Sequence, residues 1–556
     1  MRMSTDENQD EDQALETIAA AAQAGITVFD TARAYGNNER LLAHGLRRAK
    51  ADATARIVTK GGMSRAGGGW IPDGRAKAIR ADCEASLAAL DGLAIDLYLI
   101  HVPDPRTPWR TSVRALARLA DEGLVRHVGL SNVNRLQLDE ALDLAPVTAV
   151  QVALSPYDDQ ALRGGVVDRC AEKGIAVIAH SPLGGPRRAG RLARRQELVD
   201  VADARGVTPW EVALAWLLEL SPVVVAIPGG RRPESARSAA RAATLALDDG
   251  DRAVLDRAFG EPRPTRRTRR RPSDDAEIVL VMGIPGAGKS RVAEDYVGRG
   301  YLRLNRDELG GTLRDLAGAL DEELSSGARR FVLDNTYLTR ASRSYVLDVA
   351  RQHGIPSRCV WLDTPLAQAQ VNLVERLLER FGSLPSPEEL RAVARREPGV
   401  HAPTSQMRTL RELEPPAADE GFASVEQVPF TRSAGRGRVG AFIAAAAFRE
   451  PDWKGALEQG DRRVPHLVFD WKPGGAAEEN ADVASLLTAE VSGPVESALC
   501  PHPAGPPICW CRPPLPGLPL AFARKHAVDP SRSVLLGTSA AHRTLATSLG
   551  ARYIQV

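Results

Sequence analysis

The sequence predicts a multidomain α/β protein built on parallel β-sheets. Short apolar runs alternate with helical stretches from Ala14 to Gly260, among them "ITVFD", "DLYLIH" and "IAVIAH". Repeated βα units with continuous apolar strands are typical of parallel sheets covered by helices, either open or closed into a barrel. At 556 residues the chain is also too long for a single core, and domains of about 100–250 residues would give about three.

Two segments of distinct composition divide the chain. "EPRPTRRTRRRPSDDAE" (261–277) is Pro-rich and basic, and "TRSAGRGRVG" (431–440) is a shorter break. The first has the composition of a linker, with a basic arm that binds phosphates as the alternative. We therefore predict domains at 1–260, 277–432 and 433–556, the first two joined by a basic linker at 261–276.

The overall composition is that of a globular protein, with a net charge of +2, 44% hydrophobic and 26% charged residues. This near-neutral charge neither favours nor excludes a nucleic-acid partner, because a local groove can still be basic. There is no signal-peptide pattern and no apolar run of about 18 residues, so we predict a cytoplasmic protein with no membrane partner.

Polar residues follow the predicted strands of the first domain. They are Asp30, Lys60, His101, Asn132, Gln151 and His180. Because the carboxyl ends of barrel strands form the rim that carries an active site, these side chains are candidates for chemistry.

Four residues of the first domain form a chemically sensible set. "FDTARAYG" supplies Asp30 and Tyr35, "VTKGG" supplies Lys60, and "YLIHVPDP" supplies His101. A tyrosine can donate a proton to a carbonyl if a nearby ammonium lowers its pKa; a carboxylate would hold that lysine, and a histidine would orient the carbonyl. Each residue alone has a structural reading, and Asp30 could simply cap a helix.

Over about 250 residues the chain resembles the aldo-keto reductases, on "GITVFDTARAYGNNERLL", "LVRHVGLSN" and "AVIAHSPLGG". The resemblance implies a (β/α)8 TIM-type barrel that binds NADP(H) and reduces a small carbonyl compound with these four residues. It also implies cofactor-binding roles for Asn132, Gln151, His180, Arg231 and Arg232. The family begins with a strand that is not found here, so we expect an incomplete barrel with two unpaired edges and an internal methionine at Met1.

The second domain opens with a phosphate-binding motif. An apolar strand in "EIVLVMGIPGAGKSRVA" runs into Gly283-x-x-x-x-Gly288-Lys289-Ser290 and then a helix. Backbone N–H groups of such a loop wrap phosphates, the lysine reaches the β and γ oxygens, and the serine ligates Mg²⁺. A chance match is the alternative. The candidates for binding ATP and Mg²⁺ are Gly283, Pro285, Gly286, Gly288, Lys289 and Ser290.

Further polar residues could complete a phosphotransfer site. Asp307, in "YLRLNRDEL", could accept a proton from an attacking hydroxyl or cap the helix "ELGGTLRDL". Asp334 lies at the end of the strand in "RRFVLDNTYLTRASR", near where a second acidic residue would meet Mg²⁺. Arg376 and Arg380 share a helical face and could close over the transferred phosphate, although solvated arginines are common.

Roughly from 277 to 432 the chain resembles the polynucleotide 5′-kinases of nucleic-acid repair, on "GIPGAGKS", "LNRDEL" and "LDNTYLTRASR". The resemblance implies transfer of the γ-phosphate of ATP to a nucleic acid with a 5′-hydroxyl end, with Asp307 as general base. The phage-type enzymes carry an acceptor-binding arginine where this chain has Gly310. The substitutes considered are Arg306, Arg314, Arg340 and Arg343.

The third domain contains "CPHPAGPPICWC" and resembles phosphatases of the haloacid dehalogenase superfamily that carry a zinc loop. In that resemblance Cys500, His502, Cys509 and Cys511 bind a structural Zn²⁺, with free thiols as the alternative. The superfamily's Asp-x-Asp pair, lysine and second acidic motif are missing, with Thr538 and His542 where carboxylates are expected. We therefore expect an inactive phosphatase-like domain.

The leading interpretation is an ATP-dependent polynucleotide 5′-hydroxyl kinase for nucleic-acid end repair, with RNA favoured, fused to a reductase and an inactive phosphatase-like module. One alternative is an NADP-dependent carbonyl reductase fused to a small-metabolite kinase. In another, the barrel and the C-terminal module are non-catalytic scaffolds for a nucleic-acid or protein partner. The oligomeric state is left open.

Overall fold

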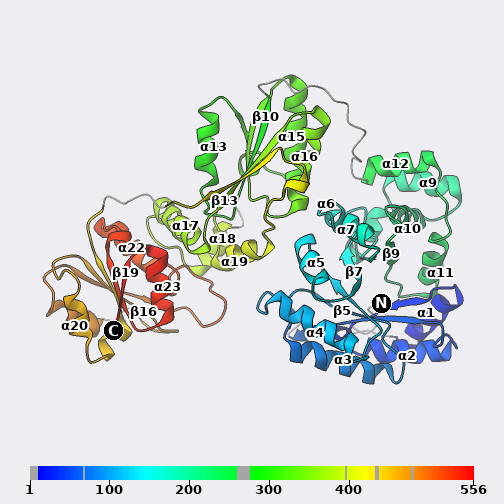
Figure 1. Ribbon diagram of the computed structural model, residues 1–556, viewed down its shortest axis with the longest axis horizontal. Coiled ribbons are helices and arrows are strands. Elements are labelled where there is room, and N and C mark those ends of the chain that lie inside the picture. Colours follow the sequence, from blue (N-terminus) through cyan, green and yellow to red (C-terminus); the bar gives the residue numbers. More distant parts are fainter. Residues whose placement is uncertain are drawn as a thin grey trace. The chain divides into compact units, whose positions relative to one another are not determined.

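The computed structural model describes residues 10–66, 69–259, 276–394, 397, 399–431, 437–476 and 481–556. The chain folds as two compact units, Met1–Arg267 and Thr268–Val556 (Figure 1). Of the predicted linker at 261–276 only residue 276 is described, and the predicted break at 431–440 lies partly outside the described residues. The second unit contains both the second and the third predicted domains, each with its own sheet.

The first unit is a nearly closed parallel β/α barrel. Its strands follow the order β1-β2-β5-β6-β7-β8-β9, and every neighbouring pair is parallel. Across the residues that the structure describes, β1 and β9 each pair on one side only. The strands are β1 (Val28–Asp30), β2 (Arg56–Gly61), β5 (Leu97–Ile100), β6 (His127–Ser131), β7 (Val147–Ala153), β8 (Ala176–His180) and β9 (Val224–Ile227), with a hairpin of β3 (Met63–Ala66) and β4 (Gly69–Pro72) after β2.

The interior of the barrel is filled by alternate residues of its strands. Val58, Leu99, Ala149 and Ile178 form a buried cluster there. Gly129 on β6 makes room for it, because an added Cβ would lie 2.6 Å from Leu99 Cδ2 and 2.4 Å from the Ala149 carbonyl oxygen. The outer faces of the strands and the helices of this unit form one apolar core. The helices are α1 (Glu11–Gln23), α2 (Asn38–Arg48), α3 (Ala76–Leu90), α4 (Trp109–Asp121), α5 (Arg135–Leu142), α6 (Gln160–Arg163), α7 (Val166–Lys173), α8 (Pro186–Leu192), α9 (Gln196–Arg205), α10 (Pro209–Glu219), α11 (Pro233–Ala242) and α12 (Asp249–Phe259).

The second unit begins with a parallel sheet of order β11-β12-β10-β13-β14. β10 is central, and its apolar residues Ile278 to Met282 are fully buried, which explains why this strand reads as a continuous apolar run. The strands are β10 (Glu277–Met282), β11 (Leu302–Leu304), β12 (Arg330–Asp334), β13 (Ser357–Asp363) and β14 (Ser424–Pro429). The helices are α13 (Lys289–Val297), α14 (Arg306–Leu309), α15 (Leu313–Ser326), α16 (Arg340–His353), α17 (Leu366–Phe381), α18 (Pro387–Ala394) and α19 (Pro403–Glu412).

A third parallel sheet, of order β17-β16-β15-β18-β19, forms the C-terminal module. Its strands are β15 (Ala441–Ala444), β16 (His466–Trp471), β17 (Val495–Cys500), β18 (Val534–Gly537) and β19 (Arg552–Gln555). Its helices are α20 (Trp453–Glu458), α21 (Ala481–Thr488), α22 (Gly517–His526) and α23 (Ala540–Leu549). Leu373 and Leu377 of α17 share one apolar cluster with Trp510, Leu520 and Leu549. The two sheets of the second unit therefore share a core.

A membrane span would need a long apolar helix, and none of the helices that the structure describes meets that requirement.

Candidate functional site

The four residues predicted to act in the barrel lie together at its rim. Asp30 ends β1, Lys60 lies on β2, and Tyr35 belongs to a short 3₁₀ turn, η1 (Arg33–Tyr35). Lys60 Nζ lies 2.6 and 2.7 Å from the two carboxylate oxygens of Asp30, and both side chains are buried. The same Nζ lies 5.6 Å from the centre of the Tyr35 ring, whose centre lies 5.7 Å from that of His101. A carboxylate-held cation beside a tyrosine and a histidine is an arrangement suited to proton donation.

Gln151 has a role that sequence reasoning missed. Its Nε2 donates to Asp30 Oδ2 at 2.8 Å, and the side chain is 2% exposed. Gln151 therefore holds the carboxylate that holds Lys60. Its cofactor-binding role stays a prediction. This partner could not be read from the sequence, because the two residues lie 121 positions apart.

Asn132 and His180 form a second polar group on the rim. Asn132 takes a left-handed backbone conformation with φ of 57° and donates from Nδ2 to the His101 carbonyl at 3.0 Å. His180 Nε2 lies 3.0 Å from Asn132 Oδ1. The structure thus joins two of the predicted cofactor-binding residues to the loop that carries His101. Arg231 and Arg232 are exposed in the segment before α11.

Trp70, on β4, also borders the barrel site and was not predicted. Its ring centre lies 6.1 Å from that of Tyr35 and 6.1 Å from that of His101, and the side chain is partly exposed. It offers an apolar wall beside the proton donor. The only trace of it in the sequence is an aromatic residue among the glycines of "AGGGW".

The phosphate-binding loop of the second unit connects β10 to α13. Gly286 and Gly288 have positive φ values of 86° and 96°, and an added Cβ on Gly286 would lie 2.3 Å from the Ala369 carbonyl oxygen. Three loop carbonyls accept hydrogen bonds from surrounding side chains: Pro285 from Gln406 at 2.9 Å, Gly286 from Asn372 at 2.7 Å, and Ala287 from Thr364 at 3.2 Å. With its carbonyls held from outside, the loop can turn backbone N–H groups toward a phosphate.

Lys289 lies at the start of α13, directly after this loop. Its Nζ donates to the carbonyls of Gly283 and Ile284 at 2.9 and 3.1 Å. Burial lowers the pKa of Lys289 to about 8, against the opposing attraction of Asp334. The ammonium is therefore poised for an anion that would stabilise its charge. Ser290, the predicted Mg²⁺ ligand, follows it and is exposed.

The predicted Mg²⁺ ligand Asp334 is already engaged. It is 2% exposed and accepts hydrogen bonds from Arg303 Nε and Nη2 at 2.8 and 2.7 Å, and from Asn305 Nδ2 at 3.0 Å. A bidentate arginine neutralises this carboxylate. Contact between Asp334 and Mg²⁺ stays a prediction. The Asp334 carboxylate would then have to bind Mg²⁺ and Arg303 at the same time.

Asp307 is half-exposed, and its side chain does not cap a helix, which was the alternative role that the sequence allowed. Asn305 caps α14, accepting from Asp307 N at 2.7 Å, while Thr312 caps α15. The Asp307 carboxylate lies 3.4 Å from Arg306 Nη2 and close enough to Lys289 to raise the pKa of that lysine. Free of a capping role, Asp307 remains the candidate base.

The two arginines of α17 differ in their surroundings. Arg376 lines a cavity beside the phosphate-binding loop and lowers the pKa of Lys289 by its charge. Arg380 forms an ion pair with Glu397 instead. His401, which sequence reasoning missed, lies near the same charges, and burial followed by the charge of Lys289 lowers the pKa of His401 to about 4. Its carbonyl accepts a hydrogen bond from Trp510 Nε1 at 3.0 Å.

Two of the arginines considered as substitutes at the acceptor site are engaged elsewhere. Arg343 is fully buried and forms a bidentate ion pair with Glu420, with hydrogen bonds of 2.7 and 2.6 Å. Its proposed contact with an acceptor is wrong, because no part of the side chain reaches the surface. Arg340 binds the side chain and carbonyl of Asp419 at 2.9 and 3.1 Å. Arg306 is the arginine that lies beside Asp307.

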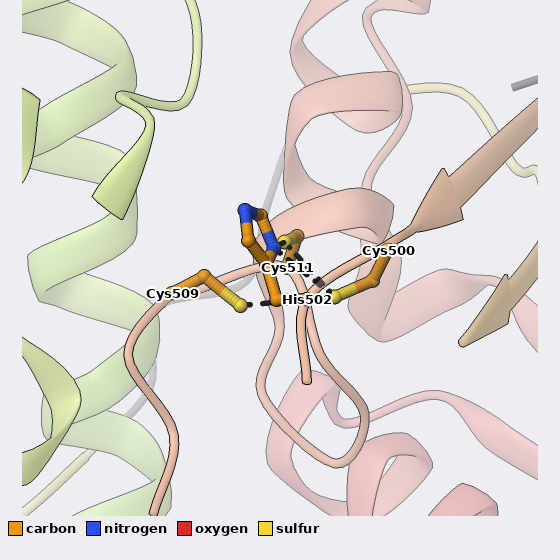
Figure 2. Close-up of side chains that lie close together, drawn as sticks. All are labelled: Cys500, His502, Cys509 and Cys511. Atoms are coloured by element: carbon orange, nitrogen blue, oxygen red, sulfur yellow. Dashed lines mark hydrogen bonds between the residues drawn. The ribbon is translucent and has the colours of Figure 1, made fainter. Parts of the chain in front are cut away.

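The four Cys and His residues of the C-terminal module converge on one point, as Figure 2 shows. Their ligand atoms all lie within 4.8 Å of one another, and the close pairs are 3.2 to 3.7 Å apart. A tetrahedral Zn²⁺ with bonds of about 2.0–2.3 Å would place its ligand atoms roughly 3.3–3.8 Å apart. Hydrogen bonds with Cys500 and then Cys511 lower the pKa of Cys509, whereas hydrogen bonds within the same cluster raise the pKa of Cys500 and of Cys511. The donor set therefore fits Zn²⁺ in spacing and chemistry.

The carboxyl ends of the central C-terminal strands carry no acidic pair in the part of the chain that is described. β15 ends at Ala444 and continues into Ala445, and β18 is followed by Thr538. His542 Nδ1 accepts from Thr538 N at 3.2 Å, and its ring packs against Phe469 with ring centres 5.8 Å apart. The expected lack of phosphatase activity stays a prediction.

Comparison with known proteins finds matches to family models in two parts of the chain. The model of the aldo/keto reductase family matches residues 1–258, and that of an AAA domain matches residues 278–396. The second match supports a nucleotide-binding, kinase-like P-loop module. The chain is 25% identical to the crystallised aldo/keto reductase from Klebsiella pneumoniae in complex with NADP and acetate, covering 48% of this chain and 91% of that one with a TM-score of 0.40.

Curated relatives match the first unit. An uncharacterized oxidoreductase of Schizosaccharomyces pombe is 32% identical over 255 residues, which cover 45% of this chain and 80% of that protein. A probable aldo-keto reductase of Glycine max is 32% identical over 251 residues, which cover 39% of this chain and 71% of that protein. The chain shares this identity with most of the length of each relative, and Asp30, Tyr35, Lys60 and His101 lie together at the barrel rim. The chain therefore belongs to the aldo/keto reductase family through residues 1–258.

Proposed function

We propose that the barrel reduces a small carbonyl compound with NADPH. The observation that carries this proposal is the buried Lys60–Asp30 ion pair beside Tyr35 and His101. NADPH supplies the hydride when bound. The Tyr35 hydroxyl donates its proton to the carbonyl oxygen, while Lys60 stabilises the tyrosinate that remains and His101 orients the carbonyl. Asp30, held by Gln151, keeps Lys60 charged and in place.

Arginine side chains and a helix terminus support the choice of cofactor. Arg231 and Arg232 immediately precede α11, which begins at Pro233. Guanidinium groups and the N-terminus of a ten-residue helix together suit a phosphate group. We infer that this segment binds the 2′-phosphate that distinguishes NADP(H) from NAD(H).

We infer that the second unit transfers the γ-phosphate of ATP to the 5′-hydroxyl end of a polynucleotide. This inference rests on the phosphate-binding loop with Lys289, beside an uncapped, half-exposed Asp307. Asp307 would accept the proton of the attacking hydroxyl, and Lys289 and Arg376 would neutralise charge on the phosphates. Ser290 would hold Mg²⁺, which would supply further positive charge against the phosphates. The resemblance of "LNRDEL" and "LDNTYLTRASR" to polynucleotide kinases favours this acceptor over a small metabolite.

The test is transfer of labelled γ-phosphate from ATP to 5′-hydroxyl RNA and DNA oligonucleotides. Asp307→Ala is expected to lower the transfer rate by about 10²–10⁴-fold with ATP binding retained, since only the base is lost. Lys289→Ala should lose both phosphate transfer and ATP binding. Glu322→Ala, which removes an exposed acid of α15, is the matched control and should change neither. If bound ATP labels no oligonucleotide, the acceptor is a small metabolite and the polynucleotide proposal fails.

We also propose that Cys500, His502, Cys509 and Cys511 bind a structural Zn²⁺ ion. The purified chain is expected to contain about one equivalent of zinc, as a closed four-ligand site would hold. Cys511→Ser should lower the zinc content and the thermal stability of the second unit, because metal binding is coupled to folding. Cys170→Ser, which changes a cysteine of the barrel, is the control and should retain the metal. A folded wild-type chain that neither contains nor takes up zinc would contradict this proposal.

A further inference from the structure

The hairpin of β3 and β4 lies at the barrel rim, next to the candidate catalytic residues. β3 begins shortly after Lys60 and lies against η1, the turn that carries Tyr35. Hydrogen bonds fix the base of the hairpin, from Gly62 N to Asp82 Oδ2 at 2.8 Å and from Asp73 N to the Gly62 carbonyl at 2.9 Å. The hairpin is therefore held at the edge of the barrel site.

Arg65 and Trp70 form a cross-strand pair on this hairpin. They lie directly opposite each other in its antiparallel register, so both side chains are on the same face of the hairpin. The Arg65 guanidinium carbon lies 4.8 Å from the centre of the Trp70 ring, which is a cation–π contact. The centre of the Trp70 ring also lies 6.1 Å from that of Tyr35 and 6.1 Å from that of His101. The face that carries Trp70 to the candidate proton donor therefore carries a cation as well.

Arg65 differs from the other cations near this site because no acid balances its charge. The others are held in ion pairs: Lys60 with Asp30, Arg33 with Glu39, Arg75 with Asp73 and Arg106 with Asp104. Among the residues that the structure describes, no carboxylate forms an ion pair with Arg65, and its side chain is exposed. A guanidinium offers a planar set of N–H donors that matches a carboxylate in two parallel hydrogen bonds. Because the contact with Trp70 already restricts the arginine, less conformational entropy is lost when a ligand binds.

We propose that Arg65 and Trp70 form a substrate subsite of the barrel that selects carbonyl compounds carrying a carboxylate. The proposal rests on the proposed carbonyl reduction at Tyr35. The reacting carbonyl would lie at Tyr35 and His101. The carbon skeleton would pack against the Trp70 ring, and Arg65 would bind the carboxylate. An aromatic aldehyde acid fits this arrangement, because its ring can stack on the indole while its aldehyde and its carboxylate point in opposite directions.

The experiment compares reduction of 4-formylbenzoate with that of 4-formylbenzamide, which has the same ring and aldehyde but no charge. Arg65→Met keeps an apolar side chain opposite Trp70 and removes the guanidinium. It is expected to lower kcat/KM for 4-formylbenzoate by about 10–100-fold, mainly through KM, the range expected from losing hydrogen bonds to a charged group. The kcat/KM for 4-formylbenzamide and the affinity for NADPH should stay at wild-type values. Arg114→Met, which removes an exposed arginine of α4, is the matched control and should change none of these quantities.

Binding of terephthalate, a dicarboxylate with no aldehyde to reduce, tests the subsite separately from the chemistry. Its affinity for the full chain with NADP⁺, measured by calorimetry, should fall at least tenfold in Arg65→Met. If Arg65→Met changes kcat/KM equally for both aldehydes, or if terephthalate binding does not depend on Arg65, the subsite proposal is wrong. If terephthalate binding depends on Arg65 but the wild-type chain reduces neither aldehyde, the subsite stands and the proposed reduction at Tyr35 fails.

Discussion

Tyr35→Phe is expected to lower kcat for NADPH-dependent carbonyl reduction by about 10²–10⁴-fold, the range typical of losing a general acid. The substitution removes one oxygen atom and keeps the ring that lies against His101 and Trp70. The Lys60–Asp30 ion pair does not depend on that hydroxyl, so the rim should keep its shape. The affinity for NADPH, measured by fluorescence titration, should therefore stay near the wild-type value.

Tyr98→Phe is the matched control for this prediction. Tyr98 is fully buried on β5, and its hydroxyl donates to the Ile79 carbonyl at 3.1 Å. Its loss should cost about 0.5–1.5 kcal/mol of stability and leave kcat unchanged. Steady-state rates with a panel of aldehydes and ketones provide the measurement. A Tyr35→Phe enzyme with nearly wild-type kcat would show that the proton comes from another group.

The residues at the barrel rim could be predicted because their positions follow from a local rule. "DLYLIH" contains β5, and "IAVIAH" contains β8, so the residues that end these runs had to meet at one edge of a parallel sheet. The phosphate-binding loop was predictable for a similar reason, since its glycines and lysine act within one short segment. In both cases the spacing along the chain determines the geometry.

Contacts between distant segments could not be predicted in this way. Helical spacing puts Arg376 and Arg380 on one face of α17, but their roles depend on neighbours from other segments. Arg376 lies near the phosphate-binding loop, whereas Arg380 pairs with Glu397. His401 and Trp510 are 109 positions apart, and their hydrogen bond exists only because the two sheets of the second unit share a core. No periodicity in the sequence reports such a partner.

Arg343→Met is expected to lower the free energy of unfolding of the second unit by about 3–5 kcal/mol, because it leaves the Glu420 carboxylate buried without its partner. Arg343 and Glu420 are 0% and 2% exposed at their side chains, so solvent cannot replace the lost charge. The substitution also removes the Nη1 hydrogen bonds to the carbonyls of Tyr337 and Glu414, at 3.0 and 2.9 Å. Hydrogen exchange of β10 and β12 peptides measures this loss in the second unit separately from the barrel.

Arg340→Met separates burial from charge. Arg340 also pairs with an acid, but Asp419 is half-exposed, so this change should cost at most about 1 kcal/mol. The double variant that combines Arg343→Met with Glu420→Leu should recover much of the lost free energy of unfolding, since an apolar pair leaves no buried charge. If Arg343→Met keeps its exchange protection but loses phosphate transfer to oligonucleotides, the arginine acts on the acceptor after all. The expected outcome is that Arg343→Met loses hydrogen-exchange protection while its folded molecules transfer phosphate at the normal rate. This result would show that Arg343 stabilises the fold and that the acceptor is bound elsewhere, where Arg306 lies beside Asp307.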